Sequence, residues 1–163
     1  MTETSPGAPH PLRSLCAWCG VMIRDGPPAP VSHGICLSCS AASGIFPIEN
    51  IHGLDADALD ALPWGTVVLD ADGRVVEYNS AEERLAEVSR HDVLGRLFFT
   101  EVAPCTSVAE FGGRYAEMAR LECSTPEHFE FIFRFNHGQV LVEIAMAYDP
   151  DLRRGTLLVR AVP

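Results

Sequence analysis

The sequence predicts an α+β protein, a five-stranded antiparallel sheet with helices on one face, preceded by a small N-terminal zinc-binding module. Two observations carry this prediction. Strand-like segments with alternating apolar residues lie before and after a run of helix-like segments, an order typical of α+β folds. Two C-x2-C pairs lie near the N-terminus, in a segment too short to build a core of its own.

Composition and charge limit the classes of function. The chain has 163 residues and a net charge of −10, and it contains no lysine. This charge argues against a nucleic-acid-binding face, because phosphate contacts need clustered Lys and Arg. No apolar run approaches the roughly 18 residues of a membrane span, and the polar start lacks the apolar centre of a secretory signal. We therefore expect a cytoplasmic protein that binds neither membranes nor nucleic acids, in a compartment where cysteines rarely form disulfides.

Changes in composition along the chain predict four segments. Residues 1–15 are polar and proline-rich and are predicted to be disordered. Residues 16–40 hold the cysteine module, 41–62 a linker and a short helix, and 63–163 the sheet domain. The short helix is expected to begin after Asp55 as N-cap and to stop before a proline.

The cysteine module reads CAWCGVMIRDGPPAPVSHGICLSC. Cys16 and Cys19 form the first C-x2-C pair, and Cys36 and Cys39 form the second after a gap of 16 residues. Each pair can bring two sulfurs to one ion, so the two pairs predict one structural Zn²⁺ held by four thiolates. Free thiols, a redox-active pair, or His33 in place of one thiolate are the alternatives. The segment resembles short cysteine modules found beside bacterial sensor domains, which implies a structural or interaction role.

The first half of the sheet domain is predicted to hold a hairpin and two main helices. TVVLD and RVVEY are strand-like and are joined by the turn signal ADG. In SAEERLAEV, Ser80 and Glu83 have the spacing of a capping box at a helix start. In SVAEFGGRYAEMARLE, the longest expected helix, Ser107 and Glu110 have the same spacing, although two glycines weaken its second turn.

Three strands are predicted to close the chain. Phenylalanines alternate with other residues in FEFIFRF, so one face of this strand is aromatic: Phe129, Phe131, Phe133 and Phe135. HGQ makes a turn into VLVEIAMAY, whose alternate residues are again apolar, and TLLVRAV completes the sheet.

Cys105 follows a proline and lies two residues before the expected helix start at Ser107. A helix N-terminus favours the thiolate form of a nearby cysteine, which a nucleophile needs. The alternative is a small thiol buried in the core. His91, His128 and His137 could each supply a base, but nothing in the sequence orients any of them, so we expect no enzyme.

The order of these elements resembles the PAS sensor fold over about residues 61–163, and more narrowly the photoactive yellow protein (xanthopsin) family. EYNSAEE resembles the YNxAE stretch of that family, which ordinary PAS domains also carry. FFTEVAPCT, followed by EF, is similar to the segment that holds the family's chromophore cysteine.

This resemblance implies a blue-light photoreceptor that binds p-coumaric acid as a thioester on Cys105. Tyr78 and Glu82 would hydrogen-bond the buried phenolate, and Phe133 and Phe135 would wall the pocket. Light would isomerise the chromophore, Glu82 would give up its proton, and partial unfolding would make a signalling state. An unidentified signalling protein, or a homodimer, would then receive the signal.

The chain departs from the family at several positions. Ala86 stands where the family commonly has threonine, and Val88 replaces an arginine that covers the chromophore, with Arg90 nearby. His137 lies in a shorter loop. These departures concern colour, phenolate stabilisation and photocycle rate. The other interpretations are a chromophore-free PAS module for protein interaction or redox sensing, and a zinc-knuckle nucleic-acid regulator, which the charge disfavours.

Overall fold

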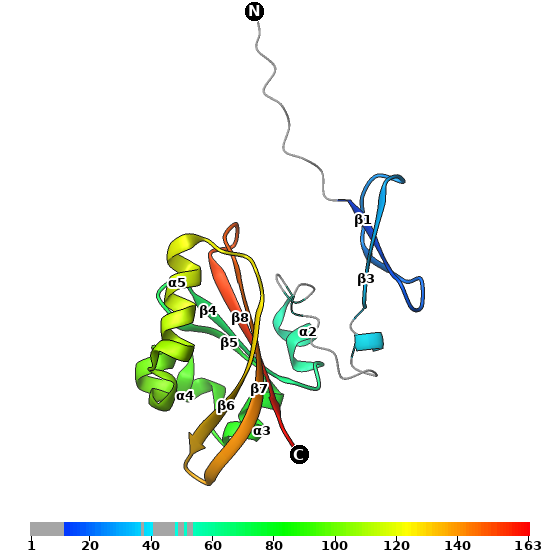
Figure 1. Cartoon of the computed structure of the whole chain (residues 1–163). Coiled ribbons are helices and arrows are strands. Elements are labelled where there is room, and N and C mark those ends of the chain that lie inside the picture. Colours follow the sequence, from blue (N-terminus) through cyan, green and yellow to red (C-terminus); the bar gives the residue numbers. More distant parts are fainter. Residues whose placement is uncertain (1–11, 37, 41–47, 49–50, 52–53) are drawn as a thin grey trace, which may run out of the picture. The chain divides into compact units, whose positions relative to one another are not determined.

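The structure, a computed structural model, describes residues 12–36, 38–40, 48, 51 and 54–163. The chain divides into two compact units, Met1–Asn50 and Ile51–Pro163. The helices and strands in Figure 1 are β1 Arg13–Cys16, β2 Met22–Arg24, β3 Val31–Gly34, α2 Ala56–Asp60, β4 Gly65–Asp70, β5 Val75–Tyr78, α3 Ser80–Ala86, α4 Arg90–Val93, α5 Arg114–Leu121, β6 Glu127–Phe135, β7 Gly138–Asp149 and β8 Arg154–Ala161. Within the described ranges, no helix is both long and apolar enough to cross a membrane.

The smaller unit is a three-stranded sheet in the order β2-β1-β3. Strand β1 pairs antiparallel with β2 and parallel with β3. Residues 13–15 lie in β1, so the prediction that disorder extends to residue 15 is wrong for these three. The strand forms because pairing with β2 and β3 satisfies its backbone groups. Residues 1–11 and 41–47, which hold most of that predicted tail and part of the predicted linker, lie outside the described residues.

The larger unit is a five-stranded antiparallel sheet in the order β5-β4-β8-β7-β6, which confirms the predicted fold class. Helices α3 to α5 cover one face, and in Figure 1 the short helix α2 lies on the other side of the sheet from α5. The alternation expected of β7 is confirmed, because one side of the strand faces the core: Val140 is half-buried, and four further residues are buried, Val142, Ile144, Met146 and Tyr148.

The expected capping box at the start of α3 is wrong, because Asn79 is the N-cap. Its Oδ1 accepts a hydrogen bond from the backbone N–H of Glu82 at 3.0 Å. The hydroxyl of Ser80 bonds Asp60 at 3.0 Å instead, and the Glu83 carboxylate accepts from the backbone N–H of residue 90 at 2.7 Å. Asparagine is as good an N-cap as serine, and here its amide also has partners elsewhere in the unit.

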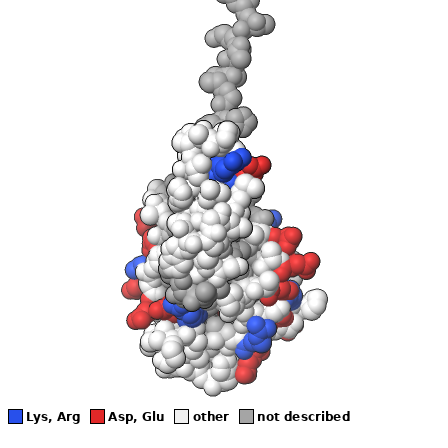
Figure 2. Space-filling view, turned by 90° about the vertical axis from the view of Figure 1, so that its right-hand side faces the viewer, with Lys and Arg blue, Asp and Glu red and all other residues white. Residues whose placement is uncertain are grey.

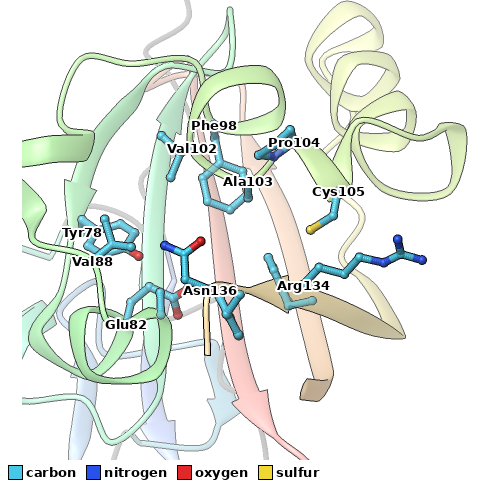
Figure 3. Close-up of a pocket in the computed structure, with 13 residues that line it drawn as sticks. Tyr78, Glu82, Val88, Phe98, Val102, Ala103, Pro104, Cys105, Arg134 and Asn136 are labelled. Carbon is cyan, nitrogen blue, oxygen red and sulfur yellow. The ribbon is translucent and has the colours of Figure 1, made fainter. Parts of the chain in front are cut away.

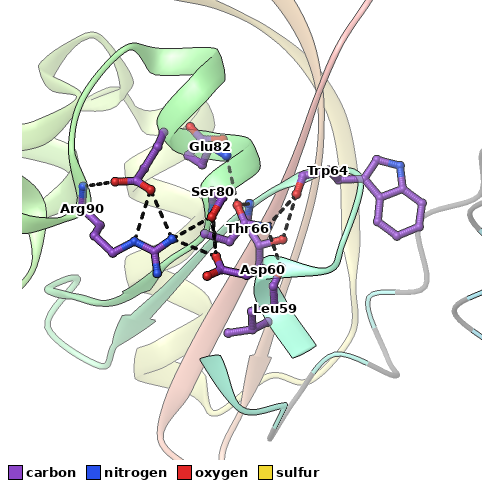
Figure 4. Close-up of polar contacts among 9 residues, drawn as sticks. Leu59, Asp60, Trp64, Thr66, Ser80, Glu82 and Arg90 are labelled. Carbon is purple, nitrogen blue, oxygen red and sulfur yellow. Dashed lines mark hydrogen bonds and ion pairs between the residues drawn. The ribbon is translucent and has the colours of Figure 1, made fainter. Parts of the chain in front are cut away.

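Asn79 is buried and hydrogen-bonds to three segments: α2, the start of β4 and α3 (Figure 4). Its Nδ2 donates to the carbonyls of Leu59 at 2.8 Å and Trp64 at 2.9 Å, and its Oδ1 accepts from the N–H of Thr66 at 2.8 Å. Every hydrogen-bonding position of the amide is therefore used. Removing it would leave buried backbone groups unpaired, which is more costly than losing a solvent-exposed bond.

The second capping box, at Ser107 and Glu110, is also wrong. Helix α5 begins only at Arg114 and is preceded by a π-helical turn, Ala109–Gly113, with no side-chain cap. Gly112 explains part of this local geometry. A Cβ at Gly112 would lie 3.0 Å from the Thr106 carbonyl oxygen and 3.2 Å from the ring of Phe99. Glycine therefore allows the close approach of this turn to the segment that carries Cys105.

Charge is dispersed over the surface in Figure 2. On the face shown there, the blue side chains of the described residues lie singly, often beside red ones, and form no broad basic patch. This distribution agrees with the net charge of −10.

Candidate functional site

A pocket opens between α3, the segment 98–105 and the end of β6. It holds about 500 Å³ of empty space, which includes open solvent at its mouth. The residues that line it are Tyr78, Glu82, Ala86, Val88, Phe98, Val102, Ala103, Pro104, Cys105, Phe133, Arg134, Phe135 and Asn136. All five residues predicted to hold a chromophore are therefore brought to one pocket (Figure 3).

Cys105 lies at one end of this pocket, in a 3-10 turn, Pro104–Thr106. The turn is fixed by Thr106, whose backbone N–H and hydroxyl both donate to the Ala103 carbonyl, at 2.9 and 2.6 Å. The expected position directly before a helix N-terminus is wrong, because Val108 and the π-helical turn separate Cys105 from α5. The thiol is half-buried and is held at the pocket by this turn.

Glu82 lies at the opposite end and is 1% exposed. Its Oε2 has no hydrogen-bond partner within the part of the chain that the structure describes. Burial raises the pKa of this carboxyl to about 8, so the group is mainly protonated at neutral pH. A buried acid with one unpaired oxygen beside a cavity is suited to donate a hydrogen bond to a ligand.

Gly65 on β4 makes room for the Glu82 carboxyl. A Cβ at this position would collide with Oε2 of Glu82 and would lie 3.1 Å from its Cδ. The buried position of the acid therefore depends on a glycine 17 residues earlier in the chain. Sequence reasoning missed this residue, since nothing near Gly65 signals which side chain it faces.

Tyr78, at the end of β5, lies beside Glu82 at the same end of the pocket (Figure 3). The residue is 3% exposed. Burial, together with the nearby carboxyl of Glu82, raises the pKa of Tyr78 above its usual range, so its hydroxyl keeps its proton. The pocket thus has two protonated oxygen donors at one end and a thiol at the other.

Aromatic rings and a polar amide complete the lining. Phe133 is 1% exposed, and Phe135 stacks on it with ring centroids 5.2 Å apart. His137 stacks on the other side of Phe135 at 5.1 Å. Phe98, which sequence reasoning missed as a wall although it lies in the FFTEVAPCT motif, is buried, and Figure 3 shows Asn136 directed into the pocket. No sequence signal pointed to Asn136.

The positions that depart from the family pattern are placed clearly. Ala86 and Val88 line the pocket and offer no polar group to a ligand. Arg90 does not replace the missing arginine, because its guanidinium binds Asp60 at 2.9 Å and Glu83 at 3.1 Å (Figure 4). Hydrogen bonding to Arg90 holds the pKa of Asp60 below its usual range. Arg90 therefore ties α4 to α2 and α3, away from the pocket lining.

The cysteine module forms a second candidate site. The Sγ atoms of Cys16, Cys19, Cys36 and Cys39 all lie within 4.8 Å of one another, and Cys19 and Cys36 approach to 3.6 Å. Zn–S bonds of about 2.3 Å place tetrahedral sulfurs about 3.8 Å apart, so the four atoms suit one zinc ion. His33 is exposed on β3 and is not part of this cluster.

Backbone geometry supports the cluster at both pairs. The N–H of Gly20 donates to the Cys16 carbonyl at 2.9 Å, and Gly20 has a φ of +75°, which glycine adopts readily. The N–H of Cys39 donates to the Cys36 sulfur at 3.5 Å. Hydrogen bonding from the Cys36 backbone lowers the pKa of Cys16 to about 6, which favours a thiolate there. Hydrogen bonding with the Cys36 side chain raises the pKa of Cys39 to about 12, so a cation is needed to hold all four residues as thiolates.

The family match to known proteins lies within the larger unit. Residues 59–162 match the family described as PAS fold. The photoactive yellow protein of Rhodothalassium salexigens is 38% identical over 101 residues, which cover 61% of this chain and 79% of the relative. That of Cereibacter sphaeroides is 31% identical over 119 residues, which cover 73% and 95%.

A solved structure gives the same result. The photoactive yellow protein domain of the sensor histidine kinase Ppr from Rhodospirillum centenum is 36% identical, with a TM-score of 0.63. The similarity covers 69% of this chain and 97% of that domain. The chain therefore belongs to the PAS fold family and, within it, to the family of the photoactive yellow proteins. The fold and this family resemblance are confirmed, whereas the zinc site remains a prediction.

Proposed function

We propose that the larger unit is a blue-light sensor that carries p-coumaric acid as a thioester on Cys105. The observation that carries the proposal is the arrangement of the pocket, with a thiol at one end and the protonated groups of Tyr78 and Glu82 at the other. The unpaired Oε2 of Glu82 supports it, because a phenolate oxygen would supply the missing partner. The walls of Phe133 and Phe135 suit a planar aromatic ligand.

The chromophore, when bound, supplies absorption of blue light and isomerisation about its double bond. The chain's own contribution is the proton of Glu82. Giving up this proton leaves a carboxylate in a site where burial alone raises its pKa to about 8. A buried and unpaired carboxylate costs several kcal/mol, which is comparable with the stability of a whole domain. Local unfolding near α3 would let water reach the carboxylate, and this exposed state would be the signal.

The proposed output is an interaction with a signalling protein or between two copies of the chain. We propose that the module senses without catalysing a reaction, since the residues that line the pocket include no histidine to serve as a base. We also propose a cytoplasmic location, because none of the six cysteines forms a disulfide bond, as expected in a reducing compartment.

The test is reconstitution of the purified chain with the anhydride of p-coumaric acid. The proposal predicts a mass gain of one coumaroyl group and a band in the visible range, both lost in Cys105→Ala. Cys123→Ala is the matched control, because Cys123 is also half-buried but does not line the pocket. A colourless protein of unchanged mass would contradict the proposal and favour a chromophore-free interaction or redox module.

We further propose that the cysteine module binds one Zn²⁺ through Cys16, Cys19, Cys36 and Cys39. The mutual approach of four sulfurs within 4.8 Å supports this, because close thiolates repel one another unless a cation lies between them. Metal analysis of the purified chain should give about one equivalent of zinc, lost in Cys16→Ser. Much less than one equivalent in the unsubstituted chain would contradict the proposal.

A further inference from the structure

The turn between β6 and β7 places a polar amide at the pocket. Only two residues, Asn136 and His137, join the two strands. Asn136 lines the pocket, and Figure 3 shows its side-chain amide directed into it, toward the end that holds Tyr78 and Glu82. Within the described ranges, this amide has no hydrogen-bond partner. A polar group that faces a cavity without a partner is a candidate to bind a ligand there.

The turn itself does not use this side chain. Asparagine and aspartate commonly stabilise a turn by accepting a hydrogen bond from the backbone N–H two residues further on. Asp70 and Asp149 do so in the turns after β4 and β7, each at 2.9 Å. Asn136 makes no such bond in the part of the chain that the structure describes. Its amide is therefore left for another role.

Contacts on both sides of Asn136 hold the turn in place. The ring of Phe135 stacks on that of Phe133 with centroids 5.2 Å apart, and the ring of His137 stacks on Phe135 at 5.1 Å. The Nδ1 atom of His137 also lies 3.6 Å from Oε2 of Glu87, the residue that ends α3. Because these contacts limit the movement of the turn, a donor at Asn136 costs little conformational entropy when it binds.

A phenolate at the inner end of the pocket would gain from a third donor, because no cation lies near it. Among the residues that line the pocket, Arg134 is the one cation, and Figure 3 shows its guanidinium extending past Cys105, away from Glu82. Ala86 and Val88 offer no polar group. The net charge of −10 also disfavours a bound anion. A further neutral hydrogen bond to the anion would offset part of this cost.

We infer that Asn136 donates a hydrogen bond from its Nδ2 to the phenolic oxygen of the bound chromophore, beside the bonds from Tyr78 and Glu82. This inference rests on the proposed function and adds one binding residue to those that the family resemblance implies. Hydrogen bonds to the charged form of a group make that form harder to protonate. Loss of the Asn136 donor should therefore let the phenolate take up a proton at a higher pH.

The first test is acid titration of the visible band of the reconstituted protein, which follows protonation of the phenolate. Asn136→Leu keeps nearly the same size and shape and removes the donor. It should raise the midpoint pH of the titration by about one to two units, as expected for one hydrogen bond to a charged group. Gln139→Leu is the matched control, because both amides are exposed but Gln139 does not line this pocket. It should leave the midpoint unchanged.

The second test needs no substitution, so it holds even if Asn136→Leu folds poorly. The sequence has only four side-chain amides, which simplifies their assignment by NMR: Asn50, Asn79, Asn136 and Gln139. Attachment of the chromophore should move a side-chain N–H proton signal of Asn136 downfield, because a bond to a charged acceptor is short and strong. The signals of Gln139 should stay where they are.

The outcomes separate this inference from the proposed function. An unchanged midpoint in Asn136→Leu, or an unchanged Asn136 amide signal, would overturn the role of Asn136 even if the chromophore is attached. An equal shift of the midpoint in Gln139→Leu would overturn it as well, since the shift would then not depend on the pocket. A protein that takes up no chromophore would overturn the proposed function itself, and the inference with it.

Discussion

Replacing the buried acid by its uncharged analogue, Glu82→Gln, should change how the stability of the chromophore-free protein depends on pH. The pKa of Glu82 rises on folding from 4.5 to about 8 because the carboxyl is buried. At low pH the carboxyl is protonated in both the folded and the unfolded state, so it does not change the unfolding free energy. As the pH rises above the pKa of the unfolded chain, the unfolded state ionises and the folded state cannot, so the folded state loses stability until the pH reaches about 8.

The size of the effect follows from the shift. At about 1.4 kcal/mol per pKa unit, a rise from 4.5 to about 8 corresponds to about 5 kcal/mol of unfolding free energy. Most of this difference should appear between about pH 5 and about pH 8. Because the amide of the glutamine variant does not titrate, the variant should lose none of this stability over the same range.

The assay is urea unfolding of both proteins across this pH range, followed by circular dichroism. The unfolding free energy of the unsubstituted chain should fall relative to that of Glu82→Gln as the pH rises. Glu110→Gln is the matched control, because it makes the same chemical substitution at an exposed position. Parallel pH profiles for the unsubstituted chain and Glu82→Gln would refute the reasoning that burial keeps this acid protonated.

Three further predictions concern single features of the structure. Gly65→Ala should lower the unfolding free energy by about 1–3 kcal/mol and weaken the visible band of the reconstituted protein, and the destabilisation should shrink when Glu82 is also replaced by alanine. Arg90→Ala should lower the urea midpoint at neutral pH and have less effect at acidic pH, where protonation of Asp60 removes the ion pair; an equal effect at both would contradict this. A zinc chelator should abolish the protection of backbone amides in residues 12–36 and leave that of β7 unchanged, as seen by hydrogen exchange, and unchanged protection in both would count against a structural metal.

The sheet could be predicted from the sequence because its signal is local. Alternating phenylalanines in β6 and alternating apolar residues in β7 fix which side of each strand faces the core. That side is largely buried in β7, and in β6 it is half-buried except for the buried Phe133. Likewise, Asp55 caps α2 as expected, accepting from the N–H of Ala58 at 2.9 Å. The serine caps predicted for α3 and α5 are wrong. Asn79 caps α3 in place of Ser80, and a turn that depends on glycine precedes α5 in place of a cap at Ser107.

The candidate site was predicted in part, because a contiguous motif carries Cys105 and a second one carries Tyr78 and Glu82. Their arrangement at opposite ends of one pocket needed the fold. Gly65 could not be predicted, because the carboxyl that it accommodates belongs to Glu82, 17 residues later. Asn136 could not be predicted either, because only the fold places the end of β6 at the pocket. The role of Arg90 was also hidden, since its partner Asp60 lies 30 residues earlier.

The central claim is that Glu82 is protonated in the dark, lies beside a light-absorbing group attached to Cys105, and gives up its proton after illumination. Infrared difference spectroscopy of the reconstituted protein, light minus dark, tests this claim most directly. Illumination should remove the absorption of one protonated carboxyl group, and Glu82→Gln should lack that signal. An illuminated protein that shows no carboxyl change, or the same change in Glu82→Gln, would contradict the account.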